Sequence, residues 1–107
     1  MNQRAKKLIN DAADMGNKGQ FTEAIRCLDE VLKVEPRSVA AWVNKGACLA
    51  NMGRLEEAKQ CFDKALEIDS FVLEAWVNKG NVFADLGQFR EAIPCFDKAL
   101  EIEPEEH

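Results

Sequence analysis

The sequence predicts an all-α fold of three stacked helix pairs, six helices in all. The segment 41–46 (AWVNKG) recurs letter for letter at 75–80, and the segment 61–68 (CFDKALEI) recurs at 95–102, both at a shift of 34 residues. Apolar residues in each copy are spaced three and four positions apart, the period of one helix face. A fixed period of this length is typical of stacked repeats that bury their apolar faces against their neighbours. The chain of 107 residues is therefore predicted to be one domain with units 5–38, 39–72 and 73–106, the first of them degenerate.

The first helix of each unit is predicted from an apolar stripe at positions i, i+4 and i+7. In the second and third units the middle position is glycine, which costs a helix interior about 1 kcal/mol relative to alanine. These glycines indicate that another helix packs closely there. Each first helix then ends at a glycine that can adopt a positive φ (Gly19, Gly53 and Gly87). The stripes are Leu8, Ala12 and Met15; Trp42, Gly46 and Leu49; and Trp76, Gly80 and Phe83.

The second helix of each unit carries a broader apolar face, with spacings of three, four and one. We expect these helices to stop at Glu35-Pro36, Asp69-Ser70 and Glu103-Pro104, since a proline disfavours helical geometry in the residue before it. Pro94 lies early in the third of them, where a missing N–H costs little, so we expect a slight bend at most. The predicted buried faces are Phe21, Ala24, Leu28, Val31 and Leu32; Leu55, Ala58, Phe62, Ala65 and Leu66; and Phe89, Ala92, Phe96, Ala99 and Leu100.

At these positions the chain resembles the tetratricopeptide repeat family, whose 34-residue unit has this order of large, small and aromatic residues. The resemblance implies a right-handed α-solenoid with a concave binding groove and without a full C-terminal capping helix here. Lys45 and Lys79 depart from the family, which has leucine there; we expect their alkyl stems to cover apolar surface while the ammonium stays in water. The matching residues are Trp42, Gly46, Leu49, Gly53, Ala58, Phe62 and Ala65 in the second unit; Trp76, Gly80, Phe83, Gly87, Ala92, Phe96, Ala99 and Pro104 in the third; and Gly19, Ala24 and Pro36 in the first.

Composition limits the functional classes. With 47% hydrophobic and 31% charged residues, the chain is typical of a soluble helical domain. The net charge is −5, and residues 73–107 carry eight acidic but only three basic side chains, so nucleic acid is not an expected partner. No apolar run is long enough to span a bilayer, and the N-terminus lacks the pattern of a signal peptide. These features predict a cytoplasmic protein without a membrane association.

Residues for catalysis or metal binding are scarce. Cys27, Cys61 and Cys95 occupy one position in successive units, about 8–10 Å apart if the helices pack normally, which exceeds the reach of a disulfide or a shared zinc ion. We interpret them and Cys48 as free thiols in a reducing compartment, with metal or redox use as the alternative. His107, the single histidine, stands at the very end and is interpreted as a terminal or tag residue. We therefore expect no enzyme activity, no metal and no cofactor.

The candidate binding residues follow from a ladder of asparagines. Asn10, Asn44 and Asn78 each lie two positions after the large apolar residue of a first helix, about 200° around the helix and away from the core. The resemblance places this side on the concave groove, where asparagine can hold the main chain of an extended peptide. The alternative is that they are ordinary solvated residues. The predicted groove residues are Lys6, Ile9, Asn10, Ala13 and Asn17; Ala40, Val43, Asn44, Ala47 and Asn51; and Glu74, Val77, Asn78, Asn81 and Asp85.

Two features refine the expected partner. Family members that grip acidic chaperone tails use basic groove residues, whereas the third unit has Glu74 and Asn78 there and only Lys6 is suitably charged. We therefore expect no carboxylate clamp and a neutral or basic ligand segment. The last helix also lacks a capping helix, so Phe96 and Leu100 form a candidate assembly face. The sequence thus predicts a non-catalytic protein-interaction module, with homo-oligomeric assembly through terminal faces as the alternative and an enzyme or metal protein as a distant third.

Overall fold

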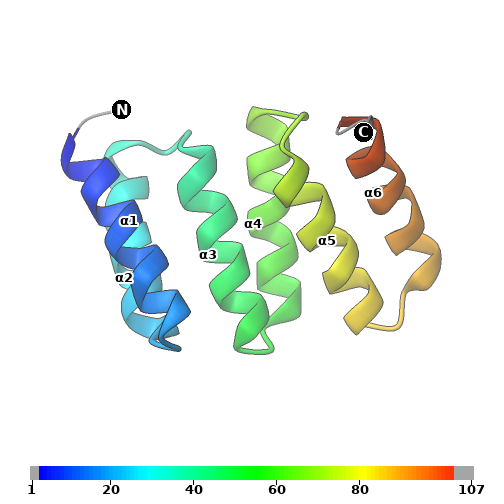
Figure 1. The fold of residues 1–107 in the computed structure, drawn as a ribbon, viewed down its shortest axis with the longest axis horizontal. Helices are drawn as coiled ribbons and strands as arrows, with labels where there is room; N and C mark the ends of the chain where they lie inside the picture. Colours follow the sequence, from blue (N-terminus) through cyan, green and yellow to red (C-terminus); the bar gives the residue numbers. More distant parts are fainter. Residues whose placement is uncertain (1–2, 103–107) are drawn as a thin grey trace, which may run out of the picture.

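The computed structural model describes residues 3–102 and consists of six α-helices joined by short turns (Figure 1). No strand occurs in this range, so the prediction of an all-α repeat fold with six helices is confirmed. The predicted stop at Glu103-Pro104 and the terminal His107 lie outside the described residues. The helices are α1 (Gln3–Asn17), α2 (Phe21–Val34), α3 (Val39–Asn51), α4 (Leu55–Ile68), α5 (Leu73–Asp85) and α6 (Phe89–Ile102).

The helices stack in chain order along the longest dimension of the molecule (Figure 1). Each helix packs against the next one in the sequence, and α1, α3 and α5 also touch in succession. Helices of the first pair do not contact helices of the third. The molecule measures 37 × 28 × 25 Å. Its contacts are those of a repeat stack, in which each unit packs only against its neighbours.

The turns inside the pairs follow from one backbone requirement. Gly53 has φ 80° and ends α3 in the left-handed region, which lets the amide of Arg54 donate to the Leu49 carbonyl at 2.9 Å. The same geometry recurs at Gly19 and Gly87, both with φ 79°. The predicted role of these three glycines is confirmed.

The glycines inside α3 and α5 make room for an aromatic ring. A Cβ added to Gly46 would lie 2.6 Å from Cε1 of Phe62, and one added to Gly80 would lie 2.6 Å from Cε1 of Phe96. The close packing predicted from these glycines therefore exists. The second helix of the same pair provides the contact, through the edge of a phenylalanine.

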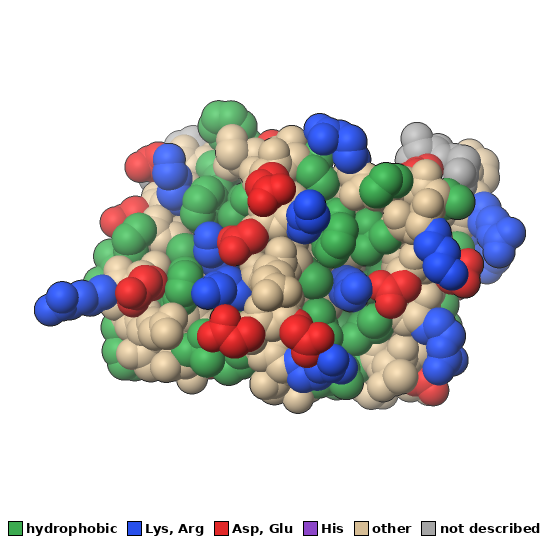
Figure 2. All heavy atoms as spheres, turned by 180° about the vertical axis from the view of Figure 1, so that it is seen from behind, with side chains coloured by type: hydrophobic (Ala, Val, Ile, Leu, Met, Phe, Trp, Pro, Cys, Tyr) green, Lys and Arg blue, Asp and Glu red, His purple; other side chains and the backbone are tan. Residues whose placement is uncertain are grey.

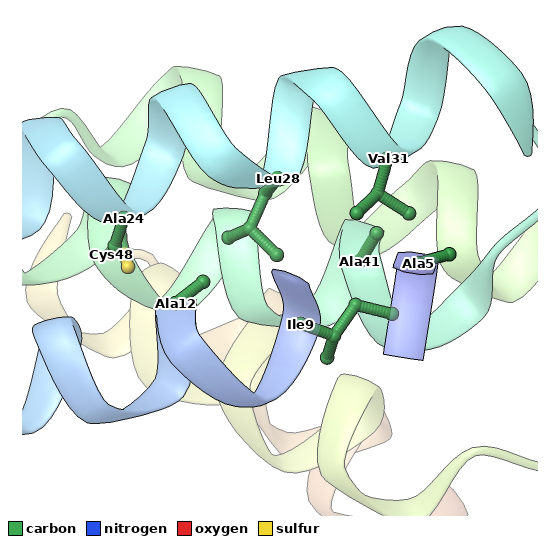
Figure 3. Close-up of a cluster of buried hydrophobic side chains, with 8 residues drawn as sticks. All are labelled: Ala5, Ile9, Ala12, Ala24, Leu28, Val31, Ala41 and Cys48. Carbon is green, nitrogen blue, oxygen red and sulfur yellow. The ribbon is translucent and has the colours of Figure 1, made fainter. Parts of the chain in front are cut away.

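The core crosses the boundaries between repeats. Figure 3 shows the first cluster, in which Leu28 and Val31 of α2 lie between side chains of α1 and those of α3. Both residues are fully buried, and each such side chain stabilises the fold by about 1.5–3 kcal/mol. A second cluster joins α3, α4 and α5 around the fully buried Phe62. Each of these two clusters therefore combines side chains from more than one pair of helices.

Charged residues link each repeat to the next. Lys45 of α3 lies 2.7 Å from the Asp29 carboxylate of α2, and Lys79 of α5 lies 2.6 Å from the Asp63 carboxylate of α4. The Lys45 ammonium also lies 5.8 Å from the centroid of the Trp42 ring. The ammonium groups are therefore paired across the repeat boundary, whereas the sequence suggested that they are simply solvated. Acidic and basic side chains are interspersed over the reverse face of the stack (Figure 2).

The two tryptophans fix the loops between repeats. The indole N–H of Trp42 donates to the carbonyl of Pro36 at 2.9 Å, and that of Trp76 donates to the carbonyl of Ser70 at 2.9 Å. Both acceptors lie six residues upstream, in the loop that precedes the helix. Each first helix is thus tied to its own entry loop.

Two predictions about α6 need correction. Phe89 and Leu100 were expected on a buried face but are 64% and 70% exposed, because no described helix covers the outer side of α6. Pro94 is the sixth residue of α6, beyond the first turn, so its missing N–H removes an internal hydrogen bond to the carbonyl of Arg90. The helix nevertheless continues through Ile102.

Candidate protein-binding groove

The candidate site is the surface formed by α1, α3 and α5, here called the groove face. These three helices touch in succession, and all of the predicted groove residues lie on them. Two hollows run between them. One, of about 150 Å³, lies between α1 and α3 and is bordered by Ala13, Asn17 and Asn44 among others. The other, of about 180 Å³, lies between α3 and α5 and is bordered by Asn78, Asn81 and Asp85 among others.

The two hollows are neighbours, since Ala47 and Asn51 border both of them, and we refer to the two together as the valley. Small side chains keep the valley open. Ala47 contributes only a methyl group in the centre, and Gly16 and Ala50 occupy equivalent positions in successive repeats, one in each hollow. An extended segment could lie along this valley and meet all three repeats.

The asparagines of the ladder differ in their surroundings. Asn44 and Asn78 are half-buried, border the valley and make no side-chain hydrogen bond within the described part of the chain. Asn51 donates its Nδ2 to the Ala47 carbonyl at 2.9 Å, so only its side-chain oxygen is fully available. Asn10 is exposed and borders neither hollow. The valley therefore contains two amides whose donors and acceptors are free for a ligand.

Two predicted groove residues belong to the core. Ile9 is 8% exposed and packs in the first cluster, and Val43 is 6% exposed and packs in the second. They support the groove face from below and offer little surface to a ligand. Of the remaining predicted residues, Asn44, Ala47, Val77 and Asn78 are half-buried, and Lys6, Asn10, Ala13, Asn17, Ala40, Asn51, Glu74, Asn81 and Asp85 are exposed.

Sequence reasoning missed several residues that border the valley. Phe21 of α2 and Phe62 of α4 reach it from the second helices. Gly16 and Ala50 border it from the first helices, and Ala84 has their position in the third repeat. The recurrence of a small residue at this position in all three repeats could have indicated from the sequence that it borders the valley. The two phenylalanines gave none, because their spacing indicates only the core face of their helices.

The charge of the groove face changes along the stack. Lys6 is exposed on α1 at one end. Glu74 and Asp85 are exposed on α5 at the other end, and neither forms an ion pair with a described residue. The α5 end therefore presents two uncompensated carboxylates toward a ligand.

Three of the four cysteines, Cys48, Cys61 and Cys95, are poorly suited to act as nucleophiles. Burial raises the pKa of Cys61 to about 11, with Lys45 partly opposing the effect, and burial also raises the pKa of Cys48 and of Cys95. Thiols with such pKa values carry little thiolate near neutral pH.

Within residues 3–102, no group of three or more histidine, cysteine or acidic side chains is arranged to hold a metal ion. None of the helices in this range combines the length and the apolar character needed to cross a membrane.

The fold and its open valley define a helical repeat protein of the kind that presents an extended surface. The family model of the tetratricopeptide repeat matches residues 39–71 and 73–106, and the chain belongs to this family. The first pair, α1 and α2, lies outside these two matches but packs in the same way. Comparison with curated protein sequences gives no match.

Solved structures of the family have the same fold. The second tetratricopeptide domain of Spaghetti (RPAP3), bound to the HSP90 peptide SRMEEVD, is 21% identical, with a TM-score of 0.89 over 94% of each chain. The TPR2B domain of yeast Sti1 in its pHsp70 complex is 20% identical, with a TM-score of 0.91 over 95% of this chain and 82% of that one. The Sgt2 domain of Aspergillus fumigatus is 20% identical, with a TM-score of 0.91 over 95% of this chain and 68% of that one. At such identities the likeness establishes the fold alone.

Proposed function

We propose that this protein is a non-catalytic interaction module that binds an extended segment of a partner protein in the valley between α1, α3 and α5. The observation that carries the proposal is the pair of half-buried amides, Asn44 and Asn78, which border the valley and have no hydrogen-bond partner among the described residues. A carboxamide can donate to a peptide carbonyl and accept from a peptide N–H, so this contact depends little on the ligand's side chains. The helices that hold the amides are already ordered, so the ligand bears most of the entropy cost of binding.

The charges of the valley favour a neutral or basic segment. Glu74 and Asp85 would repel an acidic ligand at the α5 end, and Lys6 alone offers a positive charge at the other end. Two of the similar structures contain chaperone peptides. This chain has Glu74 and Asn78 where a clamp for an acidic tail needs basic residues, so we expect it to bind such tails poorly. The expected setting is the cytoplasm, without a cofactor or nucleic acid.

The proposal is tested with an array of extended ten-residue peptides of graded charge, followed by calorimetric titration of the best binders. We expect neutral and basic peptides to bind and the double variant Asn44→Ala/Asn78→Ala to weaken binding about tenfold or more, since each buried hydrogen bond contributes about 1 kcal/mol. Asn10→Ala is the matched control, because Asn10 has the same position in α1 but borders no hollow. Tight, salt-sensitive binding of an acidic chaperone-tail peptide would contradict the charge assignment. Equal loss of binding in the control would contradict the site.

A second candidate function is assembly through the uncovered end of the stack. The observation that favours it is the exposure of Phe89, Ile93 and Leu100 on α6. Sedimentation velocity at several concentrations tests it, with Leu100→Glu as the disrupting variant. Phe96 is not suitable for this test because its ring packs against Gly80, so a polar replacement would disturb the fold.

A further inference from the structure

The outer side of α6 presents an apolar surface that no described helix covers. Phe89, Ile93 and Leu100 are 64%, 59% and 70% exposed. A hollow of about 330 Å³ lies beside Leu100, between α5 and α6. We refer to this surface as the α5/α6 face; the residues that line its hollow are Leu73, Val77, Phe96, Ala99 and Leu100.

The same surface exists one repeat earlier, where it is occupied. Residues 61–68 of α4 and 95–102 of α6 are identical in sequence, so the C-terminal halves of the two helices offer the same side chains, whereas Ile93 of α6 corresponds to Lys59 of α4. On α4 the positions equivalent to Phe89 and Leu100 are Leu55 and Leu66, and both pack into the second core cluster. Ala75 and Val82 of α5 belong to that cluster. The face of α6 is thus shaped like a surface that a helix such as α5 already covers within this molecule.

Charge specifies the occupant further. Asp29 and Asp63 are equivalent residues of α2 and α4, and each pairs with a lysine of the next first helix, at 2.7 and 2.6 Å. Asp97 is the equivalent residue of α6. It is exposed, and its carboxylate has no ion pair or hydrogen bond with the side chains and main chain of residues 3–102. A helix docked as α3 and α5 are docked would bring a lysine to Asp97.

We propose that the α5/α6 face docks an amphipathic helix of a partner protein, with a lysine that pairs with Asp97. The helix carries a tryptophan three residues before this lysine and a large apolar residue four residues after it. These spacings are those of Trp42, Lys45 and Leu49 in α3, and Trp76, Lys79 and Phe83 repeat them in α5. The α5/α6 face shares Val77 with the predicted groove residues, but neither hollow of the valley is bordered by Val77, so the inference does not depend on a ligand in the valley.

A second copy stacked head to tail does not fit this description. Its accessible first helix would be α1, since α3 and α5 are packed inside the stack. At the positions of tryptophan, lysine and large apolar residue, α1 has Leu8, Asp11 and Met15. Asp11 would therefore face Asp97, and two carboxylates in this position repel each other.

The test uses the whole protein, labelled with ¹⁵N, and an acetylated and amidated synthetic peptide that copies residues 72–86. We expect the peptide to shift the backbone amide signals of Phe89, Ile93 and Leu100 and to leave those of Asn44 and Asn78 in place. Asp97→Lys should weaken binding about fivefold, the upper range for an exposed ion pair. A peptide with Lys79→Asp should lose a similar factor toward the unchanged protein, and combining both changes should restore the affinity.

Asp14→Lys is the matched control. Asp14 is exposed on α1 at the opposite end of the stack, and its replacement by lysine changes the net charge by the same amount as Asp97→Lys. Circular dichroism checks that each variant keeps its helices, and Asp97→Asn replaces Asp97→Lys if the charge reversal disturbs them. The proposal is overturned if the peptide does not bind, if its shifts fall on the groove face, or if the charge exchange fails to restore binding. It is also overturned if sedimentation shows a dimer that Leu100→Glu dissociates, because a second copy would then occupy the face.

Discussion

Replacing Gly46 with alanine adds one methyl group to α3 at a point where the structure leaves no space for it. The added Cβ would lie 2.6, 2.8 and 3.0 Å from three carbons of the Phe62 ring. The ring is fully buried among the side chains of the second core cluster, so it can move only by displacing them, although it also borders the smaller hollow between α3 and α5. Gly80→Ala creates the same approach to Phe96, with a shortest distance of 2.6 Å. Phe96, however, is only half-buried and borders the open hollow of the α5/α6 face.

Gly46→Ala and Gly80→Ala should therefore change the free energy of unfolding by different amounts, or in opposite directions. In both helices alanine gains about 1 kcal/mol of helix propensity over glycine. At Gly46 the added Cβ would meet three ring carbons at 3.0 Å or less, so overpacking should cost about 2–3 kcal/mol, the upper part of the usual range. After the gain in helix propensity, the net loss in the free energy of unfolding should be about 1–2 kcal/mol. At Gly80 the Phe96 ring can turn toward the hollow, so the net effect should range from about zero to a gain of about 1 kcal/mol.

Urea unfolding followed by circular dichroism at 222 nm measures both changes, and tryptophan fluorescence checks that one transition is present. Phe62→Leu provides the coupling control, because a smaller side chain should reduce the cost of Gly46→Ala by about 1 kcal/mol. The reasoning is refuted if Gly46→Ala is as stable as the unchanged protein, or if Gly80→Ala costs as much as Gly46→Ala.

Three further predictions concern single residues. Pro94→Gln, which places the residue of Gln60 at the equivalent position of α6, should raise the free energy of unfolding by about 2 kcal/mol by restoring a helix hydrogen bond; an unchanged urea midpoint would contradict this. Ser38→Ala should lower it by about 1 kcal/mol, because the Ser38 hydroxyl accepts the Ala41 N–H at 3.2 Å at the start of α3, and the melting temperature reports the loss. Burial raises the pKa of Cys61 from 9.0 to about 11, so the unfolded chain ionises first and stability should fall as pH rises from about 9 to about 11. Cys61→Ala should make this decline shallower in urea titrations across that range, and an equal slope would contradict the assignment.

The fold could be predicted because its signals are local. Gly53 and its counterparts require a positive φ at fixed intervals, and the 34-residue period sets the length of each helix pair. The contacts between repeats had weaker signals. Asp29 precedes Lys45 by the same interval at which Asp63 precedes Lys79, but no rule of helix periodicity connects side chains on helices of different repeats.

The helices that carry the candidate groove residues could be predicted from the sequence, but the burial of the individual residues could not. Val43 is next to Trp42 in the sequence, and periodicity alone places it at the edge of the apolar stripe. Its burial comes from the neighbouring repeat, where Ala75 and Val82 of α5 join the same cluster. Conversely, Phe89 has the spacing of a core residue but is exposed, because burial of a second helix requires a following first helix. The periodicity of a single helix cannot show whether a helix of the neighbouring repeat covers a given side chain.

The hydrogen bonds of the two indoles bear on which residues of the loops between repeats can be replaced without changing how the repeats are arranged. Each bond ends on a main-chain oxygen, at Pro36 and at Ser70, so this tie between helix and loop does not depend on which side chain stands at either position. The loops indeed differ, with Pro36 and Arg37 in one and Ser70 and Phe71 in the other. Loop side chains such as the exposed Phe71 can therefore be exchanged, or used to attach labels, while the curvature of the array stays the same.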